Sequence, residues 1–435
     1  MKKRVAIFTN FSSFSEGYSL NRVVMNQIRM LLDHGYEPTV IVGDNFHPVQ
    51  DYADPRVIIK RIPDVPVSNE VKMDSTFDQD VGALEKALAV ALEGINVVLT
   101  HDIIYQPACV KHLVAAKRLA QRRSDLLWLH WIHSATSPYT LGTLRPLFVD
   151  EYAKIISEKF PNSFYIFFNH YSIPRIAKNF NIDDGDVKVV HHPTDIKKFF
   201  KIEDSSWELI VKKDILSADV ICTYCIRLDR GKQVEAVVKT MGALKHNGNK
   251  VRLIIGDFHS TGGDKVNYRD EIKNIAIEWG LVGDDITWLS EQKADWNVEV
   301  PYEVISDFER LSNVFVMPCK SESYSLITQE CGLSGVAMVV NRDFPPFRDI
   351  FGWAPHQFGF SSNINSTTGL DGETTTTPDN EKDYYLNVAK VIQYELKNDR
   401  TLALKTMLRK DRNMHAIFVN ELEPLFYGKE DKKDE

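Results

Sequence analysis

Two acidic residues follow a predicted strand, where carboxylates could bind the hydroxyl groups of a ligand. An apolar run at 314–318 predicts the strand, and Glu322 stands in the loop behind it. Glu330 lies further along, in a short helix predicted for residues 325–333. Because a helix start offers unpaired N–H groups and a positive dipole end to phosphate, the segment predicts a nucleotide-sugar site. A helix-capping Glu322 and a solvated Glu330 explain the same residues without a ligand.

A second predicted strand end carries cations. Residues 220–226 predict a buried strand, and Arg227, Arg230 and Lys232 follow it before a helix predicted from residue 234. Arginine offers a fixed fork of donors to phosphate oxygens, and lysine offers a mobile positive charge. The loop therefore predicts a diphosphate site, although an exposed turn with solubilising charges has the same composition.

Histidines follow two strands predicted in the first half of the chain. His101, with Asp102 beside it, ends the run 97–100, and His133 comes after the run 126–132. An imidazole at a strand end can bind a substrate by hydrogen bonds, and it can equally be a structural side chain. Both histidines are candidate site residues.

The residues that bind metals elsewhere lack a ligand pattern in this sequence. Cys222 and Cys225 form a C-x-x-C pair inside an apolar run, with no second pair nearby, so we interpret them as strand cysteines of a reducing compartment. Two acidic clusters stand beside glycines: Asp183, Asp184 and Asp186, and Asp284 and Asp285. Such acids are typical of solvated turns. The sequence thus predicts no metal site and no cofactor.

Alternating apolar patterns predict the elements that position these residues. In the first half, strands are expected at 5–9, 39–42, 97–100, 126–132, 164–168 and 187–190, and helices at 20–32, 78–92 and 109–119. In the second half, strands are expected at 220–226, 251–255, 286–289, 314–318 and 337–340, and helices at 234–245, 268–279, 302–311, 325–333 and 384–408. Such alternation implies parallel sheets with right-handed crossovers. We expect two doubly wound α/β domains, with ligands at the carboxyl ends of the strands.

Composition sets the broad class of the protein. The 435 residues exceed what one core usually fills, and 43% hydrophobic with 26% charged residues is typical of a globular protein. A net charge of −8 disfavours a general polyphosphate binder but leaves room for a local basic groove. No apolar run is long enough for a bilayer span or a signal-peptide core. We therefore expect a cytoplasmic protein.

Taken together, the two strand ends resemble the signatures of retaining glycosyltransferases of the GT-B fold, family 4 type. Arg227 and Lys232 match that family's Arg-x4-Lys signature, and Glu322 and Glu330 match its Glu-x7-Glu signature. The resemblance covers residues 4–425 and implies two Rossmann-like domains, 1–200 and 201–400, facing a central cleft. Residues 401–435 would then return to the first domain and end in a charged tail.

The resemblance also implies a role for each candidate residue. Arg227 and Lys232 would hold the donor diphosphate, while Glu322 would contact the donor sugar and Glu330 the ribose. The other donor-side groups would be His101, the backbone of Tyr324, Ser325 and Leu326, and Gly17 in the loop that corresponds to the family's glycine-rich loop. His133 is the candidate on the acceptor side. Gln233 departs from the family, which commonly has glycine there.

The acceptor is not specified by the residues. Four cations lie together near the end of a predicted helix: Lys117, Arg118, Arg122 and Arg123. They suit an anionic membrane or a DNA backbone, and equally a solvated helix end. Three functions stay open: a metal-independent, retaining hexosyl or pentosyl transferase using a UDP- or GDP-sugar on a glycan, lipid-linked or small-molecule acceptor; a transferase acting on hydroxymethylated bases of phage DNA; and a noncatalytic sugar-nucleotide-binding protein.

Overall fold

The computed structural model describes residues 3–15, 17–47, 54–65, 76–134, 158–257, 265–320, 324–360, 366–368, 374–376 and 378–428. The chain forms two compact units, Met1–Pro193 with Met414–Glu435, and Thr194–Asn413. Each unit contains a parallel sheet with helices on both faces, so the predicted class of two doubly wound α/β domains is confirmed. The cleft between them stays a prediction.

The sheet of the first unit has seven parallel strands in the order β3-β2-β1-β4-β5-β6-β7. Their bounds are β1 Arg4–Thr9, β2 Glu37–Gly43, β3 Ile58–Ile62, β4 Val97–His101, β5 Leu127–Trp131, β6 Ser163–Phe167 and β7 Val187–Val189. The strand order changes direction between β1 and β4. In doubly wound sheets, ligands bind outside the carboxyl ends of the strands at such a point, where His101 ends β4.

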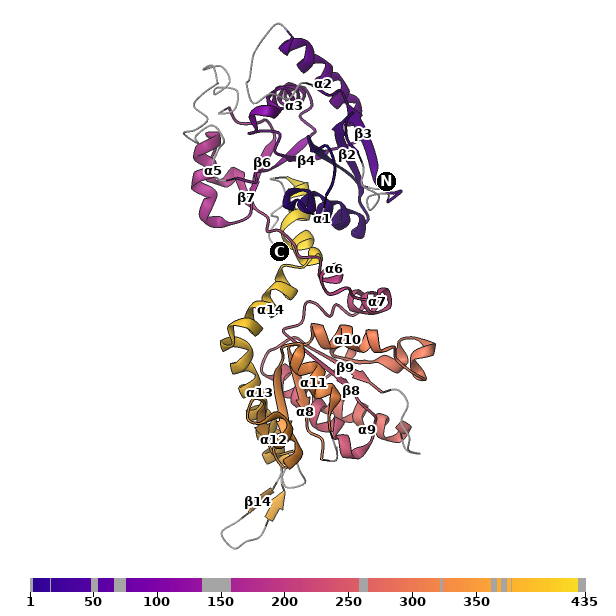
Figure 1. Cartoon of the computed structure of the whole chain (residues 1–435). Helices are drawn as coiled ribbons and strands as arrows, with labels where there is room; N and C mark the ends of the chain where they lie inside the picture. The colour runs from indigo at the N-terminus through magenta and orange to yellow at the C-terminus, as the bar shows by residue number, and fades with distance from the viewer. Residues whose placement is uncertain are drawn as a thin grey trace. The chain divides into compact units, whose positions relative to one another are not determined.

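Helices bury both faces of this sheet because successive strand residues point to opposite sides. The helices are α1 Ser19–Asp33, α2 Phe77–Ala91, α3 Val110–Arg122, α5 Ile173–Phe180 and α15 Met414–Ile417. Ala6 and Phe8 of β1 pack with α2 and α3, whereas Val5 and Ile7 pack with α1. Figure 1 shows α2 and α3 together on one side of the sheet and α1 on the other.

The C-terminal segment also packs on the first unit. Ile417, Phe418 and Leu422 lie in the same core cluster as α1, and this segment is the yellow ribbon beside α1 in Figure 1. The hydroxyl of Tyr36 donates to Glu423 Oε1 at 2.6 Å, which anchors the last turn. Residues 401–413, in contrast, belong to the second unit, and the charged tail 429–435 lies outside the described residues.

The sheet of the second unit has six parallel strands in the order β10-β9-β8-β11-β12-β13. Their bounds are β8 Val220–Cys225, β9 Val251–Gly256, β10 Ile286–Trp288, β11 Val314–Met317, β12 Ala337–Asn341 and β13 His356–Phe358. The helices are α6 Ile196–Phe200, α7 Asp204–Lys212, α8 Val234–His246, α9 Lys265–Glu278, α10 Tyr302–Leu311, α11 Leu326–Leu333, α12 Pro345–Phe351, α13 Pro378–Asn398 and α14 Arg400–Asp411. Thus β8 and β11, whose ends carry the two predicted motifs, are neighbours.

Three elements differ from the sequence-based expectation. The single helix expected at 384–408 is two helices, because the Asp399 carboxylate accepts from the N–H groups of Thr401 and Leu402 and so begins α14. Edge strand β3 has mostly exposed central residues and therefore lacks an apolar run. The expected loop after residue 363 contains an antiparallel pair, β14 Ser366–Thr368 and β15 Thr374–Thr376.

Candidate functional site

The cation-bearing loop after β8 is held by buried contacts. Lys232 is 5% exposed, and its carbonyl accepts from the Tyr224 hydroxyl at 2.7 Å. Gln233 has φ +50°, and its Nε2 donates to the Phe360 carbonyl at 2.7 Å. The backbone thus adopts the left-handed conformation that glycine, common here in the resembled family, favours. The glutamine adopts it too and uses its side chain as an anchor.

Hydrogen bonds join this loop to the segment that follows β11. The N–H of Lys320 donates to the Gly231 carbonyl at 3.0 Å. The structure therefore brings the two predicted motif loops together at the carboxyl ends of adjacent strands. Glu322 itself lies outside the described residues.

A third strand end completes this arrangement. Asn341 is the last residue of β12 and is fully buried; its Nδ2 donates to the carbonyls of Pro318 and Cys319 at 3.2 and 3.1 Å. Its Oδ1 accepts from the Phe360 N–H at 3.0 Å. We did not single out Asn341 from the sequence, although a polar residue directly after the apolar run 337–340 is a usable signal.

The start of α11 lies close behind the motif loop. Ser325 is the residue before the helix, is 2% exposed, and its Oγ lies 2.7 Å from Thr328 Oγ1. Tyr324 and Leu326, the other predicted backbone donors, have exposed side chains. The backbone groups of these three residues therefore occupy the amino end of α11, where helix N–H groups lack intrahelical partners.

Glu330 lines a cavity between α10 and α11. The Tyr302 hydroxyl donates to Glu330 Oε1 at 2.9 Å. The cavity of ≈ 570 Å³ is lined by Phe200, Tyr302, Ser306, Glu309, Arg310, Glu330, Leu333, Ser334 and Lys405. In the part of the chain that the structure describes, Arg227 and Lys232 are not among the residues lining this cavity.

Glu309 shares the cavity with Glu330 and is a residue that the sequence analysis missed. It is 2% exposed, and within the described ranges its Oε1 has no hydrogen-bond partner. Burial, and then the charge of Glu330, raise the pKa of Glu309 to about 8. Its carboxyl is therefore protonated at neutral pH. The apolar spacing of α10 does not mark this position, since Val304, Phe308 and Leu311 define the buried face.

The first unit buries His101 completely. Its Nε2 lies 2.8 Å from Gln27 Oε1, and its Nδ1 lies 3.0 Å from His133 Nε2. Burial, and then the neighbouring His133, lower the pKa of His101. Both ring nitrogens are thus used inside the unit, and neither is left for the predicted contact with a donor sugar. Gln27 was missed, although it falls on the apolar face of α1 between Val24 and Leu31.

Asp102, which follows His101, has a strained backbone. Its φ is +63°, a left-handed conformation that is uncommon for residues other than glycine. Its Oδ1 accepts a hydrogen bond from the Tyr105 hydroxyl, and that hydroxyl accepts from the His133 N–H at 3.1 Å. The loop after β4 therefore holds the backbone that follows β5.

Gly17, the predicted donor-side glycine, lies in an exposed loop. The nearest atom to a Cβ built on it is Ser15 Oγ at 3.7 Å, which is ordinary van der Waals contact. The described surroundings of this position therefore do not require glycine. Its contact with a donor stays a prediction.

The cations predicted to contact a membrane or DNA are paired with acids. Lys117 contacts Glu158 at 3.2 Å, Arg118 contacts Asp78 at 2.9 Å, Arg122 pairs with Glu85, and Arg123 contacts Asp125 at 2.7 Å. Because each charge is balanced locally, the end of α3 does not present an excess of positive charge. The structure gives no support to this predicted contact.

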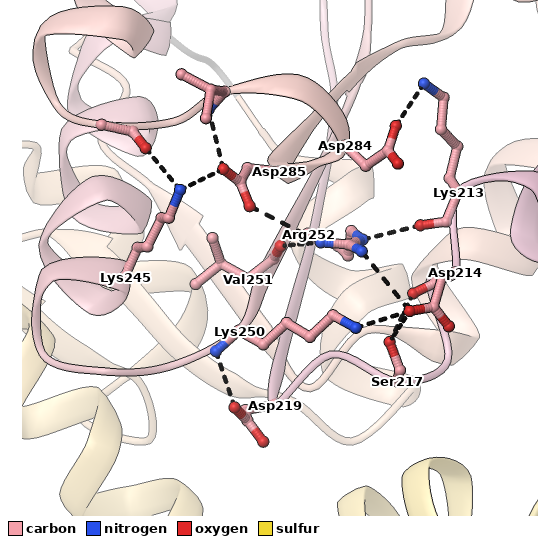
Figure 2. A network of polar contacts seen from close by, with 12 residues as sticks. Lys213, Asp214, Ser217, Asp219, Lys245, Lys250, Val251, Arg252, Asp284 and Asp285 are labelled. Atoms are coloured by element: carbon pink, nitrogen blue, oxygen red, sulfur yellow. Dashed lines mark hydrogen bonds and ion pairs between the residues drawn. The ribbon is translucent and has the colours of Figure 1, made fainter. Parts of the chain in front are cut away.

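The acidic pair Asp284 and Asp285 belongs to an ion-pair network, shown in Figure 2. Asp284 contacts Lys213 at 2.7 Å, and Asp285 contacts Lys245 at 2.6 Å. The buried Arg252 lies between them and donates to the Lys213 carbonyl at 3.0 Å. Across the described residues, no three side chains of histidine, cysteine, aspartate or glutamate are placed to hold a metal ion.

The C-x-x-C pair lies on a strand, as predicted. Residues three apart on a strand point to opposite faces, and Cys222 and Cys225 accordingly pack in different core clusters. Burial raises the pKa of Cys222 to about 12. The two thiols therefore cannot act as a chelating pair. Within the described part of the chain, no helix combines the length and apolar character that a bilayer span requires.

No family model matches the chain, and no curated protein sequence is similar to it. Among solved structures, it is similar to sucrose-phosphate synthase from Thermosynechococcus elongatus, with 18% identity, 96% of each chain covered and a TM-score of 0.35. It is also similar to HepE from Anabaena in complex with UDP (12% identity, 96% and 97% covered, TM-score 0.34) and to a glycosyltransferase from Rickettsia africae (12% identity, 98% and 96% covered, TM-score 0.33). Identities and TM-scores at this level carry no conclusion about the chemistry of this chain.

Proposed function

We propose that this protein is a retaining glycosyltransferase that moves a sugar from a nucleotide-diphosphate sugar, a UDP- or GDP-sugar, to an acceptor hydroxyl. One observation carries the proposal: the Lys320–Gly231 hydrogen bond, which joins the loop of Lys232 to the loop that contains Glu322. The two loops follow adjacent parallel strands, and α11 begins directly behind them. A loop with two cations beside a helix start suits a diphosphate.

The chemistry of transfer requires stabilisation of the leaving diphosphate. In this proposal, Arg227 and Lys232 hold the diphosphate, and the N–H groups at the start of α11 add the helix dipole. Charges placed in advance around a leaving group lower the barrier because they need no reorganisation during the reaction. Glu322 contacts the donor sugar and Glu330 the ribose, with Tyr302 orienting Glu330. No metal takes part in this mechanism.

The test is a transfer and hydrolysis assay with a panel of UDP- and GDP-sugars. For the preferred donor, Lys232→Ala should lower kcat/KM by more than tenfold, about 1.4 kcal/mol of transition-state stabilisation. Lys117→Ala is the matched control, because Lys117 is similarly buried but contacts Glu158 in the other unit. Equal rates for the Lys232 variant and the wild type would contradict the proposal.

Two further readouts examine the mechanism of the same reaction. An α-linked product from an α-linked donor, identified from its anomeric NMR coupling, indicates retention, whereas a β-linked product contradicts it. Activity should persist in EDTA, and its loss would contradict the metal-free mechanism. Donor binding without turnover on any acceptor would instead indicate the noncatalytic sugar-nucleotide-binding protein.

A further inference from the structure

Three side chains of the first unit form a hydrogen-bonded array that ends near the surface. Gln27 on α1 is 2% exposed, His101 at the end of β4 is fully buried, and His133 after β5 is partly exposed. Gln27 Oε1 lies 2.8 Å from His101 Nε2, and His101 Nδ1 lies 3.0 Å from His133 Nε2. The array therefore leads from the interior of the unit to the carboxyl edge of its sheet.

The chemistry of these groups fixes the position of each proton. An amide oxygen can only accept, so His101 Nε2 carries a proton and donates to Gln27. A neutral imidazole has one donor and one acceptor, which leaves His101 Nδ1 as an acceptor for a proton on His133 Nε2. His133 Nδ1 consequently carries a lone pair. Over the residues that the structure describes, this atom has no hydrogen-bond partner.

The backbone of His133 is fixed by a second, independent contact. Its N–H donates to the Tyr105 hydroxyl at 3.1 Å, and that hydroxyl donates in turn to Asp102. Asp102 adopts a left-handed φ of +63°, a strained backbone of the kind that persists where the surrounding structure requires it. His101 and Asp102 therefore hold both the ring and the backbone of His133.

We infer that His133 is the imidazole that the first unit offers to a substrate hydroxyl, with Gln27 and His101 as positioning residues that keep its Nδ1 a hydrogen-bond acceptor. This inference rests on the proposed function for the identity of the substrate, a sugar. It exchanges the roles expected from the sequence, in which His101 contacts the donor. Geometry decides between the two, since His101 has no ring nitrogen left and His133 has one.

The surroundings of His133 favour a hydroxyl over an anion. Burial, and then the neighbouring His192, lower the pKa of His133 to about 4, so the ring is neutral at physiological pH. A neutral acceptor binds a hydroxyl proton but does not attract phosphate or carboxylate. The rings of Phe168 and His192 lie 5.8 and 6.3 Å from that of His133. Aromatic faces of this kind suit the apolar face of a sugar ring.

The first test measures the proton positions directly and needs no activity. Nitrogen NMR of the full-length chain with 15N-labelled histidine distinguishes protonated from unprotonated ring nitrogens, and His133→Asn assigns the signal. We expect His133 as a single tautomer, protonated at Nε2. Gln27→Leu should populate the second tautomer, whereas Asn21→Leu, also buried on α1 but bonded to the Ser13 carbonyl, should not. A wild-type His133 protonated at Nδ1 overturns the inference.

The second test separates the inference from the proposed function. With the donor and acceptor that the wild type prefers, His133→Phe should lower kcat/KM by at least tenfold, and His133→Gln, which restores an acceptor oxygen, should recover part of that loss. A wild-type rate in His133→Phe overturns the inference while leaving the proposed function intact. A wild type that turns over no nucleotide-sugar defeats the proposed function, and the NMR result then decides the positioning of His133 alone.

Discussion

The buried acid of the cavity between α10 and α11 gives a sharp test of the structure. Glu309 is 2% exposed, and Glu330 lines the same cavity. We consider Glu309→Gln, which keeps the size of the side chain and removes its ionisation. Because a neutral glutamine cannot acquire the buried charge, the substitution isolates the cost of ionising this one group.

The sign and size of the effect follow from the pKa. Burial and the charge of Glu330 raise the pKa of Glu309 from 4.5 in an unstructured chain to about 8 in the fold. The folded state therefore binds this proton more tightly, so the stability that the group contributes is complete below pH 4.5 and is lost as the pH rises toward 8. At about 1.4 kcal/mol per pH unit, the wild type should lose roughly 2.5 kcal/mol relative to Glu309→Gln between pH 5 and pH 7.

The assay is urea unfolding of both chains at pH 5, 6, 7 and 8, with the difference in unfolding free energy plotted against pH. Glu303→Gln is the control, because Glu303 is an exposed residue in the first turn of the same helix. Its difference from the wild type should stay within about 0.5 kcal/mol at every pH. Glu330→Gln should shorten the pH window from its upper end, since it removes the second cause of the shift and leaves burial.

Parallel curves for the wild type and Glu309→Gln would refute this reasoning. They would mean that Glu309 has an ordinary pKa and therefore reaches water. A curve of opposite slope would mean that the ionised carboxylate is stabilised in the fold by a cation. In that case Arg310 or Lys405, which line the same cavity, would be the group to replace next.

Two further predictions concern stability, and both are measured by chemical denaturation. Gly242→Ala should destabilise the chain by roughly 1–3 kcal/mol, because a Cβ there would lie 2.7 Å from the backbone oxygen of Trp279; Gly82→Ala, with nothing within 4 Å of its Cβ, should stabilise it by about 0.5–1 kcal/mol. Arg252→Met should cost roughly 2–4 kcal/mol because it removes the buried donors of the network in Figure 2, whereas Arg56→Met, which breaks an exposed pair, should cost less than about 1 kcal/mol. Equal costs within either pair of variants would contradict the corresponding contact.

Much of the fold was predictable because buried parallel strands leave a strong local signal. Strands covered on both faces are continuous apolar runs, and this holds for β8, β9 and β11. Edge strand β3 and the break between α13 and α14 were not predicted. Strand β3 has exposed central residues, and the break depends on one capping carboxylate, that of Asp399.

The candidate site was predictable only in part, for a related reason. The types of Arg227, Lys232 and Glu330 pointed to a phosphate and hydroxyl site, because charge and hydrogen-bonding capacity belong to the side chains themselves. The role of His101 could not be derived in this way. Its two partners, Gln27 and His133, lie on different elements, and only packing brings their atoms within hydrogen-bond distance.

The sequence by itself determined the alternation of strands and helices, the two-unit architecture, and the residue types at the strand ends, since these depend on local apolar pattern and chemistry. Only the tertiary structure decided which strand ends are neighbours, which histidine keeps a ring nitrogen for a ligand, and which acid is protonated. Those properties depend on strand order and on burial. Both arise from contacts between residues far apart in the chain, such as Lys320 with Gly231 and Glu309 with Glu330.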